Sequence, residues 1–173
     1  MIGGRGAMFV LAGLAGLLVV MAVMSGWQGT TRLTQQQDHT NAVEESCRSF
    51  VEAYGTFDFR DPASYRNRLM SLTTGTLKTA VASSQIDLVA LGQLRTITTE
   101  ILDVQVTALS EDDATASATS RQLQQSMDPT FGQLVEEEVI QHVACRVALA
   151  GGSWLVAEFR LRSEEPVRPT PHR

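Results

Sequence analysis

Hydrophobic residues are distributed unevenly along this chain of 173 residues, and the first segment is the most apolar. Residues 7–27 form a nearly unbroken apolar run, and no charged residue lies between Arg5 and Arg32. At about 1.5 Å per residue, a helix of this length spans about 30 Å, the thickness of the hydrocarbon core of a bilayer. The run predicts a transmembrane helix over residues 7–27, preceded by a short tail, residues 1–6.

A cleaved secretory signal is the competing interpretation of this run. Such signals have an apolar stretch of about 7–15 residues followed by small residues before the cleavage site, which Val23-Met24-Ser25 matches poorly. Trp27 suits the headgroup level of an uncleaved anchor. The short tail and the acidic remainder of the chain favour a cytoplasmic N-terminus. We therefore expect a single-pass protein of the plasma (inner) membrane, with its C-terminal domain outside the cytoplasm.

The pattern after the apolar run is typical of amphipathic helices. Residues 28–41 are polar and are either a spacer or the first solvated turns of a helix. From residue 42, apolar positions recur every three or four residues up to Gly55, which predicts a helix. Asp61-Pro62 predicts the start of a second helix. A third helix is expected over residues 75–84, and one or two further turns over residues 86–93. The apolar positions of the first helix are Val43, Cys47, Phe50, Val51 and Tyr54.

After Arg95 the chain is rich in Thr, Val and Ile and is interrupted by turn signals, as expected for antiparallel strands. Within the third strand, Val143 and its alternate neighbours face the core, whereas His142 faces away. Gly151-Gly152 predicts a tight hairpin before the last strand. The final residues, 163–173, contain three prolines and predict a disordered tail. The four strands are expected over residues 95–109, 114–126, 135–149 and 154–162.

Helices followed by antiparallel strands are typical of the α+β class, with helices packed on one face of a curved, four-stranded sheet. We expect this domain to span residues 42–162. The chain has 19 acidic and 14 basic residues and a formal net charge of −5, with no basic cluster. This balance argues against binding to nucleic acid.

Two cysteines are candidates for a structural cross-link. Cys47 lies on the apolar face of the first predicted helix and Cys145 on the apolar face of the third strand. Outside the cytoplasm such a pair can remain oxidised as a disulfide, and the alternative is two reduced cysteines in the core. A disulfide would close a loop of about a hundred residues and stabilise the fold by about 3–4 kcal/mol in the chain-entropy model.

No catalytic, cofactor-binding or metal-binding residues are predicted. His142 faces away from the core, and Glu100 and Asp103 are acidic residues of a kind that long strands commonly expose. The carboxylates of residues 136–138 alternate between the two sides of a strand, so they do not converge on a cation. We therefore expect a protein that is not an enzyme and has no cofactor.

The second predicted strand is unusually polar for its length. Either it is an edge strand that is protected from aggregation by its polarity, or it is an edge that binds a partner. The residues concerned are Arg121, Gln122, Gln124 and Gln125.

This order of elements resembles the cystatin or nuclear-transport-factor-2-like cone fold. The resemblance is carried by SFVEAYGTFDF at 49–59, RLMSLTTGTL at 68–77 and GGSWLVAEFRL at 151–161. Two groups of envelope proteins resemble the chain in this way: the bitopic assembly factors of type IV secretion and conjugation systems, and the mammalian-cell-entry (Mce)-associated membrane proteins.

The resemblance implies a membrane-anchored scaffold or accessory subunit of a bacterial envelope transport or secretion complex. Such a protein acts by binding other envelope proteins and copies of itself. The alternative is a carrier of a small ligand such as a lipid, or an enzyme, that uses the interior of the cone. A scaffold should have a filled cone, whereas a carrier should have an open pocket of about several hundred Å³.

Overall fold

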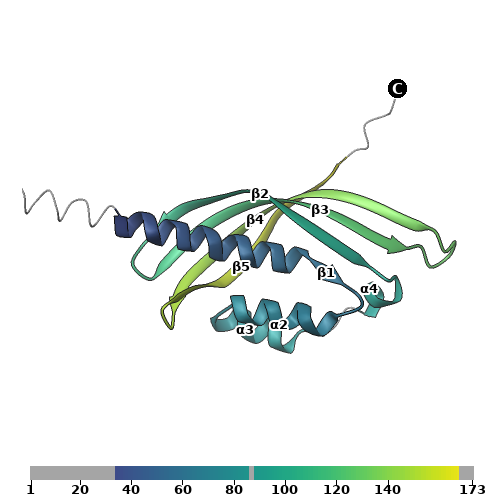
Figure 1. The fold of residues 1–173 in the computed structure, drawn as a ribbon, viewed down its shortest axis with the longest axis horizontal. Coiled ribbons are helices and arrows are strands. Elements are labelled where there is room, and N and C mark those ends of the chain that lie inside the picture. Colours follow the sequence, from purple (N-terminus) through teal and green to yellow (C-terminus); the bar gives the residue numbers. More distant parts are fainter. Residues whose placement is uncertain (1–33, 86–87, 168–173) are drawn as a thin grey trace, which may run out of the picture. The chain divides into compact units, whose positions relative to one another are not determined.

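The computed structural model describes residues 34–85 and 88–167 (Figure 1). The chain divides into two compact units, residues 1–39 and 40–173. In the first unit the described residues, 34–39, are helical. Among the described residues, no helix is both long and apolar enough to cross a bilayer. The predicted tail and membrane helix, residues 1–27, lie outside the described part of the chain.

The second unit begins with the long helix, residues 40–55, whose apolar stripe follows the predicted spacing. Its buried side chains recur every three or four residues, and they include Val43, Cys47 and Phe50, each at most 1% exposed. Of the polar segment 28–41, residues 34–41 are helical, and residues 28–33 lie outside the described part of the chain.

Three further helices follow near their predicted positions: α2 (Pro62–Leu72), α3 (Gly75–Ser83) and α4 (Leu88–Gly92). The carboxylate of Asp61 caps α2 by accepting a hydrogen bond from the backbone N–H of Ser64 at 3.1 Å. Hydrogen bonds from Ser64 lower the pKa of Asp61, so the cap is charged at neutral pH.

The sheet has five antiparallel strands, in the order β1-β2-β3-β4-β5, so the prediction of four strands is wrong. The additional strand is β1, whose two residues pair with Ile97 and Thr96 of β2. A strand of two residues has no alternation to detect, which explains why the sequence pattern missed it. The strands are β1 (Phe57–Asp58), β2 (Thr96–Leu109), β3 (Asp113–Met127), β4 (Leu134–Ala150) and β5 (Ser153–Pro166).

The last strand is longer than predicted. Residues 163–166, which we expected to be disordered, continue β5 and pair with residues 139–142 of β4. Gln141 also donates a side-chain hydrogen bond to Glu164 at 2.6 Å. On the β5 side of β4, the backbone groups of residues 139–142 pair with this segment alone. These backbone hydrogen bonds hold residues 163–166 in the strand despite their polar sequence. Residues 168–173 of the predicted tail lie outside the described residues.

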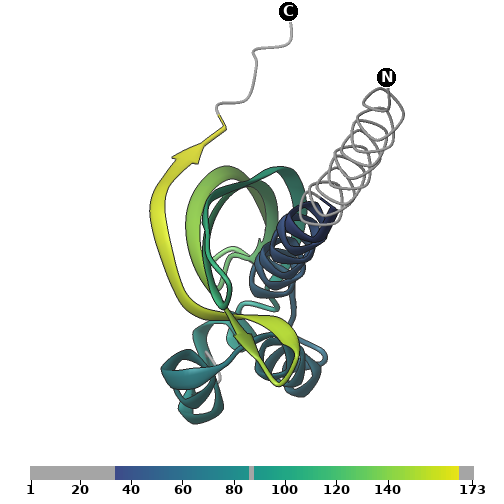
Figure 2. The ribbon, with the colours of Figure 1, turned by 90° about the vertical axis from the view of Figure 1, so that its left-hand side faces the viewer.

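The sheet curls (Figure 2), and the strands on either side of the central pair, β2 and β5, contain extra residues that leave the pairing register. In β2 the register skips Leu102 and Thr107, and in β5 it skips Arg162 and Ala157. Each extra residue is a β-bulge, which bends the strand and increases its twist. Four bulges, two on either side, therefore wrap the sheet around its concave face.

The long helix packs against this concave face through small side chains of β3. Ala114, Ala116 and Ala118 are at most 4% exposed and belong to one cluster with the helix stripe and residues of β4 and β5. Small residues permit the backbone of the helix to approach the sheet closely. Ser46 of the helix also donates a hydrogen bond to the backbone carbonyl of Trp154 at 2.9 Å.

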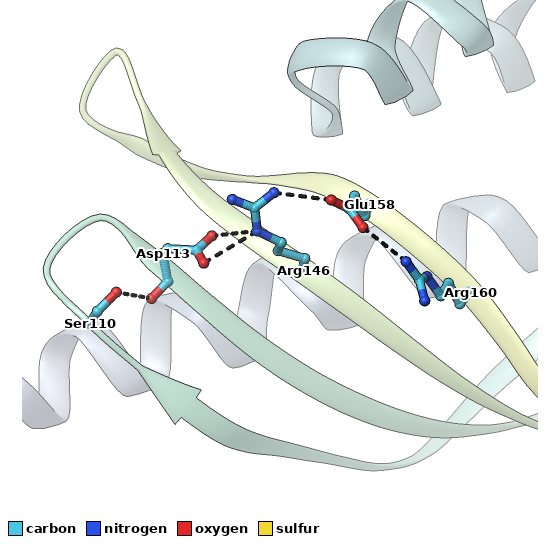
Figure 3. Close-up of polar contacts among 5 residues, drawn as sticks. All are labelled: Ser110, Asp113, Arg146, Glu158 and Arg160. Carbon is cyan, nitrogen blue, oxygen red and sulfur yellow. Dashed lines mark hydrogen bonds and ion pairs between the residues drawn. The ribbon is translucent and has the colours of Figure 1, made fainter.

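The opposite face of the sheet carries rows of charged side chains (Figure 3). Arg146 of β4 contacts Asp113 of β3 at 2.9 Å and Glu158 of β5 at 3.0 Å, and Glu158 also pairs with Arg160. These carboxylates raise the pKa of Arg146, Asp113 contributing most. Because the groups are half exposed, the row favours one strand register more than it stabilises the fold.

Gly55 ends the long helix at a point where a side chain would not fit. A Cβ atom at this position would overlap the side chains of Thr99 and Gln122, whereas one at Gly92 would meet no atom within 4 Å.

We expect Gly55→Ala to lower the free energy of unfolding by about 1–3 kcal/mol because of overpacking. Gly92→Ala is the matched control and should leave it unchanged or raise it by up to about 1 kcal/mol. Thermal unfolding of the full-length variants in mild detergent measures both. Equal stability of the two variants would contradict this close approach.

Candidate functional site

A cavity of about 410 Å³ lies between the helices and the sheet. Its walls come from the long helix, β1, α2, α3, the region of α4, and strands β2 and β5. It is open to solvent on one side, so the cone is not filled. The lining residues are Phe50, Tyr54, Phe57, Pro62, Tyr65, Arg66, Leu69, Leu77, Ala80, Val81, Ser84, Gln85, Ala90, Arg95, Ile97 and Phe159.

Aromatic rings form one wall of the cavity. The ring of Phe159 on β5 lies 5.3 Å from that of Phe50 and 4.4 Å from that of Tyr54, measured between centroids. The rings of Phe57 and Tyr65 meet edge to face at 5.3 Å. Such contacts fix the rings relative to each other. The packed rings therefore form a fixed apolar wall on this side of the open cavity.

Tyr65 is a polar group of the cavity that is already hydrogen-bonded. Its hydroxyl donates to the backbone carbonyl of Tyr54 at 3.0 Å, which ties α2 to the end of the long helix. Burial raises the pKa of Tyr65 to about 12. The hydroxyl is therefore neutral at physiological pH and adds no negative charge to the cavity.

Arg95 is placed at the cavity by the turn that ends α4. The backbone N–H of Leu94 donates to Leu91 at 3.1 Å and that of Arg95 to Ala90 at 2.9 Å, which is the Schellman pattern. Leu94 takes the left-handed position of this motif with φ 52°, where glycine is usual. The unusual conformation turns the chain so that the following side chain lines the cavity.

A smaller polar recess of about 250 Å³ adjoins the cavity and shares Tyr54, Tyr65 and Ile97 with it. Amide and carboxylate side chains from β3, β4 and β5 line the remainder, together with Gly55 and Val139. The recess lies beside the layer of buried polar residues that includes Ser120 at 0% and Gln122 at 7% exposure. The lining side chains from these strands are Gln122, Gln124, Glu137, Gln141 and Glu164.

The acidic and histidine candidates from the sequence lie away from the cavity. Glu100 pairs with Arg121, and Asp103 accepts a hydrogen bond from Gln105. His142 contacts the hydroxyl of Thr119 at 3.1 Å and lines neither cavity nor recess. Among the described residues, no cluster of three or more His, Cys, Asp or Glu side chains is arranged to hold a metal ion.

The polar strand β3 is a central strand, so the prediction that it lies at an edge is wrong. It pairs with β4 along its whole length and with β2 over residues 114–125, and its polar side chains contact side chains of the neighbouring strands. Arg121 contacts Glu138 at 3.1 Å and Gln125 donates to Glu136 at 2.6 Å. By alternation Arg121 and Gln125 face outward. Gln122 and Gln124 line the inner recess instead, so the four predicted residues divide between two faces.

Cys47 and Cys145 meet in the core between the long helix and β4. Both are free thiols, at most 1% exposed, and their side chains are hydrogen-bonded to each other. This bond lowers the pKa of Cys47, whereas the same bond, together with burial, raises the pKa of Cys145. Formation of the disulfide stays a prediction.

We expect protein isolated from an oxidising compartment without reductant to have lost two hydrogens, lowering its mass by about 2 Da. Intact-mass measurement before and after treatment with reductant, in denaturant, detects this change. Cys47→Ser should abolish the difference, and because the chain has only two cysteines no other pair can replace it. Alkylation of both thiols in unreduced, denatured protein would refute the prediction.

No family model matches the sequence, and no curated protein matches it. Solved structures do match the fold. The VirB8 protein of Agrobacterium tumefaciens has a TM-score of 0.53 at 7% identity, covering 76% of this chain and 96% of that one. An Ntf2-like protein involved in plasmid conjugation has a TM-score of 0.50 at 14% identity, covering 80% and 52%.

A TrwG component of a type IV secretion system from Bartonella birtlesii has a TM-score of 0.42 at 15% identity, covering 73% of this chain and 91% of that chain. At these identities the similarity concerns the fold. The α+β architecture and the curled antiparallel sheet agree with it. The second unit of this chain therefore has the nuclear-transport-factor-2-like cone fold that the sequence resemblance indicated.

Proposed function

We propose that the chain is a single-pass, membrane-anchored subunit of a bacterial envelope secretion or transport complex. Its cone domain lies outside the cytoplasm and acts by binding other envelope proteins, including copies of itself. The observation that carries the proposal is the match of the cone to VirB8 over 96% of that chain. The match to a protein involved in plasmid conjugation gives further support.

In this proposal the apolar run at residues 7–27 anchors the cone domain to the membrane. An anchored domain is confined to a thin layer beside the membrane, which raises its effective concentration for partners in that layer. Interfaces of modest affinity then suffice for assembly. The acidic net charge of the chain is compatible with protein partners rather than nucleic acid.

The chemistry of the cavity supports a binding role over acid–base catalysis. Tyr65 stays protonated near neutral pH because of its raised pKa, so it does not serve as a base there. The described lining is otherwise mainly aliphatic and aromatic, with two arginines. These groups favour holding a molecule over moving a proton.

We place a partner-binding surface on the outer face of β3, where two of the predicted residues project. Arg121 is 48% exposed in its side chain and lies between Glu100 and Glu138 on the neighbouring strands. Leu123, 38% exposed, lies between Arg121 and Gln125 on the same face. An arginine beside an exposed apolar side chain is typical of residues that dominate interfaces.

Affinity capture from native membranes tests both the role and the surface. The tagged full-length chain should recover other envelope components, and Arg121→Ala should lower that recovery about fivefold or more. Arg146→Ala is a matched control, because Arg146 is 49% exposed on the same face and also pairs with two carboxylates. It should leave recovery unchanged.

Two results of this experiment would count against the proposal. Recovery of the chain alone would contradict membership of an envelope complex. Equal losses with Arg121→Ala and Arg146→Ala would contradict the surface on β3, because both variants remove one outward arginine and two ion pairs.

A carrier of small ligands is the second candidate function, and the open cavity is the observation that favours it. A carrier is expected to have an open pocket of several hundred Å³, and a scaffold is expected to have a filled cone. The cavity of about 410 Å³ fits the carrier. The two functions are compatible, since the proposed partner surface and the cavity lie on opposite faces of the sheet.

A further inference from the structure

The cavity has an electrostatic bias opposite to that of the whole chain. The chain is acidic, with 19 acidic and 14 basic residues. Among the described residues that line the cavity, however, the charged ones are two arginines, Arg66 and Arg95, without an Asp or Glu. A positive charge in an apolar, partly enclosed site attracts an anion more strongly than it would in water.

Arg95 has donor capacity that the described residues do not use. Its Nε atom is buried and has no hydrogen-bond partner among them, while Nη2 donates to Gln93 at 2.6 Å. Arg66, in contrast, donates to the backbone carbonyl of Ser84 at 3.0 Å. Arg95 thus lines the cavity with part of its guanidinium donors unused, and it is the side chain at which a ligand's acceptor gains most.

The rest of the cavity suits an aliphatic chain. Leu69, Leu77 and Val81 provide aliphatic surface from α2 and α3, and Phe50 and Phe159 provide rings from the long helix and β5. The volume of about 410 Å³ is near the lower end of the range of about 300–1,000 Å³ for small-molecule sites. This size favours one acyl chain over the two chains of a phospholipid.

We propose that the cavity binds a long-chain carboxylate, a fatty acid, with its carboxylate on Arg95 and its chain along α2 and α3. A guanidinium donates charge-assisted hydrogen bonds to a carboxylate, which are stronger than those between neutral groups. Tyr65 is neutral and bonded to Tyr54, so no negative charge from that side chain competes with the ligand. This inference does not depend on the proposed secretion role.

Photolabelling of the full-length chain in membranes tests the proposal. The probe is palmitic acid carrying a diazirine and an alkyne, and labelled peptides are identified by mass spectrometry after irradiation. The label should fall on peptides of α2 and α3, and unlabelled palmitate should compete for it. Hexadecanol, which has the chain without the charge, should compete about tenfold less well or worse.

Substitutions separate a charge contact from general apolar affinity. Arg95→Gln should lower cavity labelling about tenfold or more, and Arg95→Lys should retain more of it because the charge remains. Arg68→Gln is the matched control, since Arg68 lies on α2 outside the cavity and donates to Thr56. Val81→Trp fills the space beside α3 and should also abolish labelling. Circular dichroism of each variant verifies that it is folded.

Several outcomes would overturn the proposal. These are labelling outside the cavity, equal labelling of Arg95→Gln and the unaltered chain, and equal competition by hexadecanol and palmitate. If phosphatidylglycerol vesicles compete whereas palmitate does not, the ligand is a phospholipid and the proposal is wrong. Labelling reports on the cavity alone and capture of partners on the outer face, so failure of one proposal is distinguishable from failure of the other.

Discussion

The contact between the long helix and the concave face of the sheet is the interaction on which the remainder of the domain depends. It brings the helix stripe onto Ala114, Ala116 and Ala118, with β4 and β5 completing the cluster. At about 25 cal/mol per Å², burial of such a stripe is the main favourable term in a fold of this size. The sheet must curl to meet the helix, and the bulges in β2 and β5 provide that curl.

The same contact explains why the cone is filled at one end and open at the other. Near Cys47 the helix packs directly on the small, buried side chains of β3. Towards its C-terminal end the wall is built from Phe50, Tyr54 and Phe159, whose rings pack on each other. Beyond these rings, α2 and α3 line the cavity, and the backbone N–H of Thr74 between them donates to the carbonyl of Val156 on β5 at 2.9 Å. A binding site and a stable core thus share one helix.

The sequence pattern predicted the elements whose signals are local and periodic, and it failed where the outcome depends on distant pairing. The stripe of the long helix and the Asp61 cap are local, and both were predicted. The central position of β3 was missed because the partners of Arg121 and Gln125 lie on other strands. The extension of β5 depends on the length of β4, and the cavity depends on how three helices meet the sheet. The role of Arg95 rests on the left-handed conformation of Leu94, which no residue preference indicates.

The most direct test of this account is the stability of Phe50→Ala relative to Phe131→Ala, measured as the free energy of unfolding of the full-length chain in mild detergent. Phe50 is 1% exposed where the helix meets the sheet, whereas Phe131 is 75% exposed. The account predicts a loss of about 3–5 kcal/mol for Phe50→Ala and a change within about 0.5 kcal/mol for Phe131→Ala. Similar small losses for both variants would show that the helix does not hold the fold together.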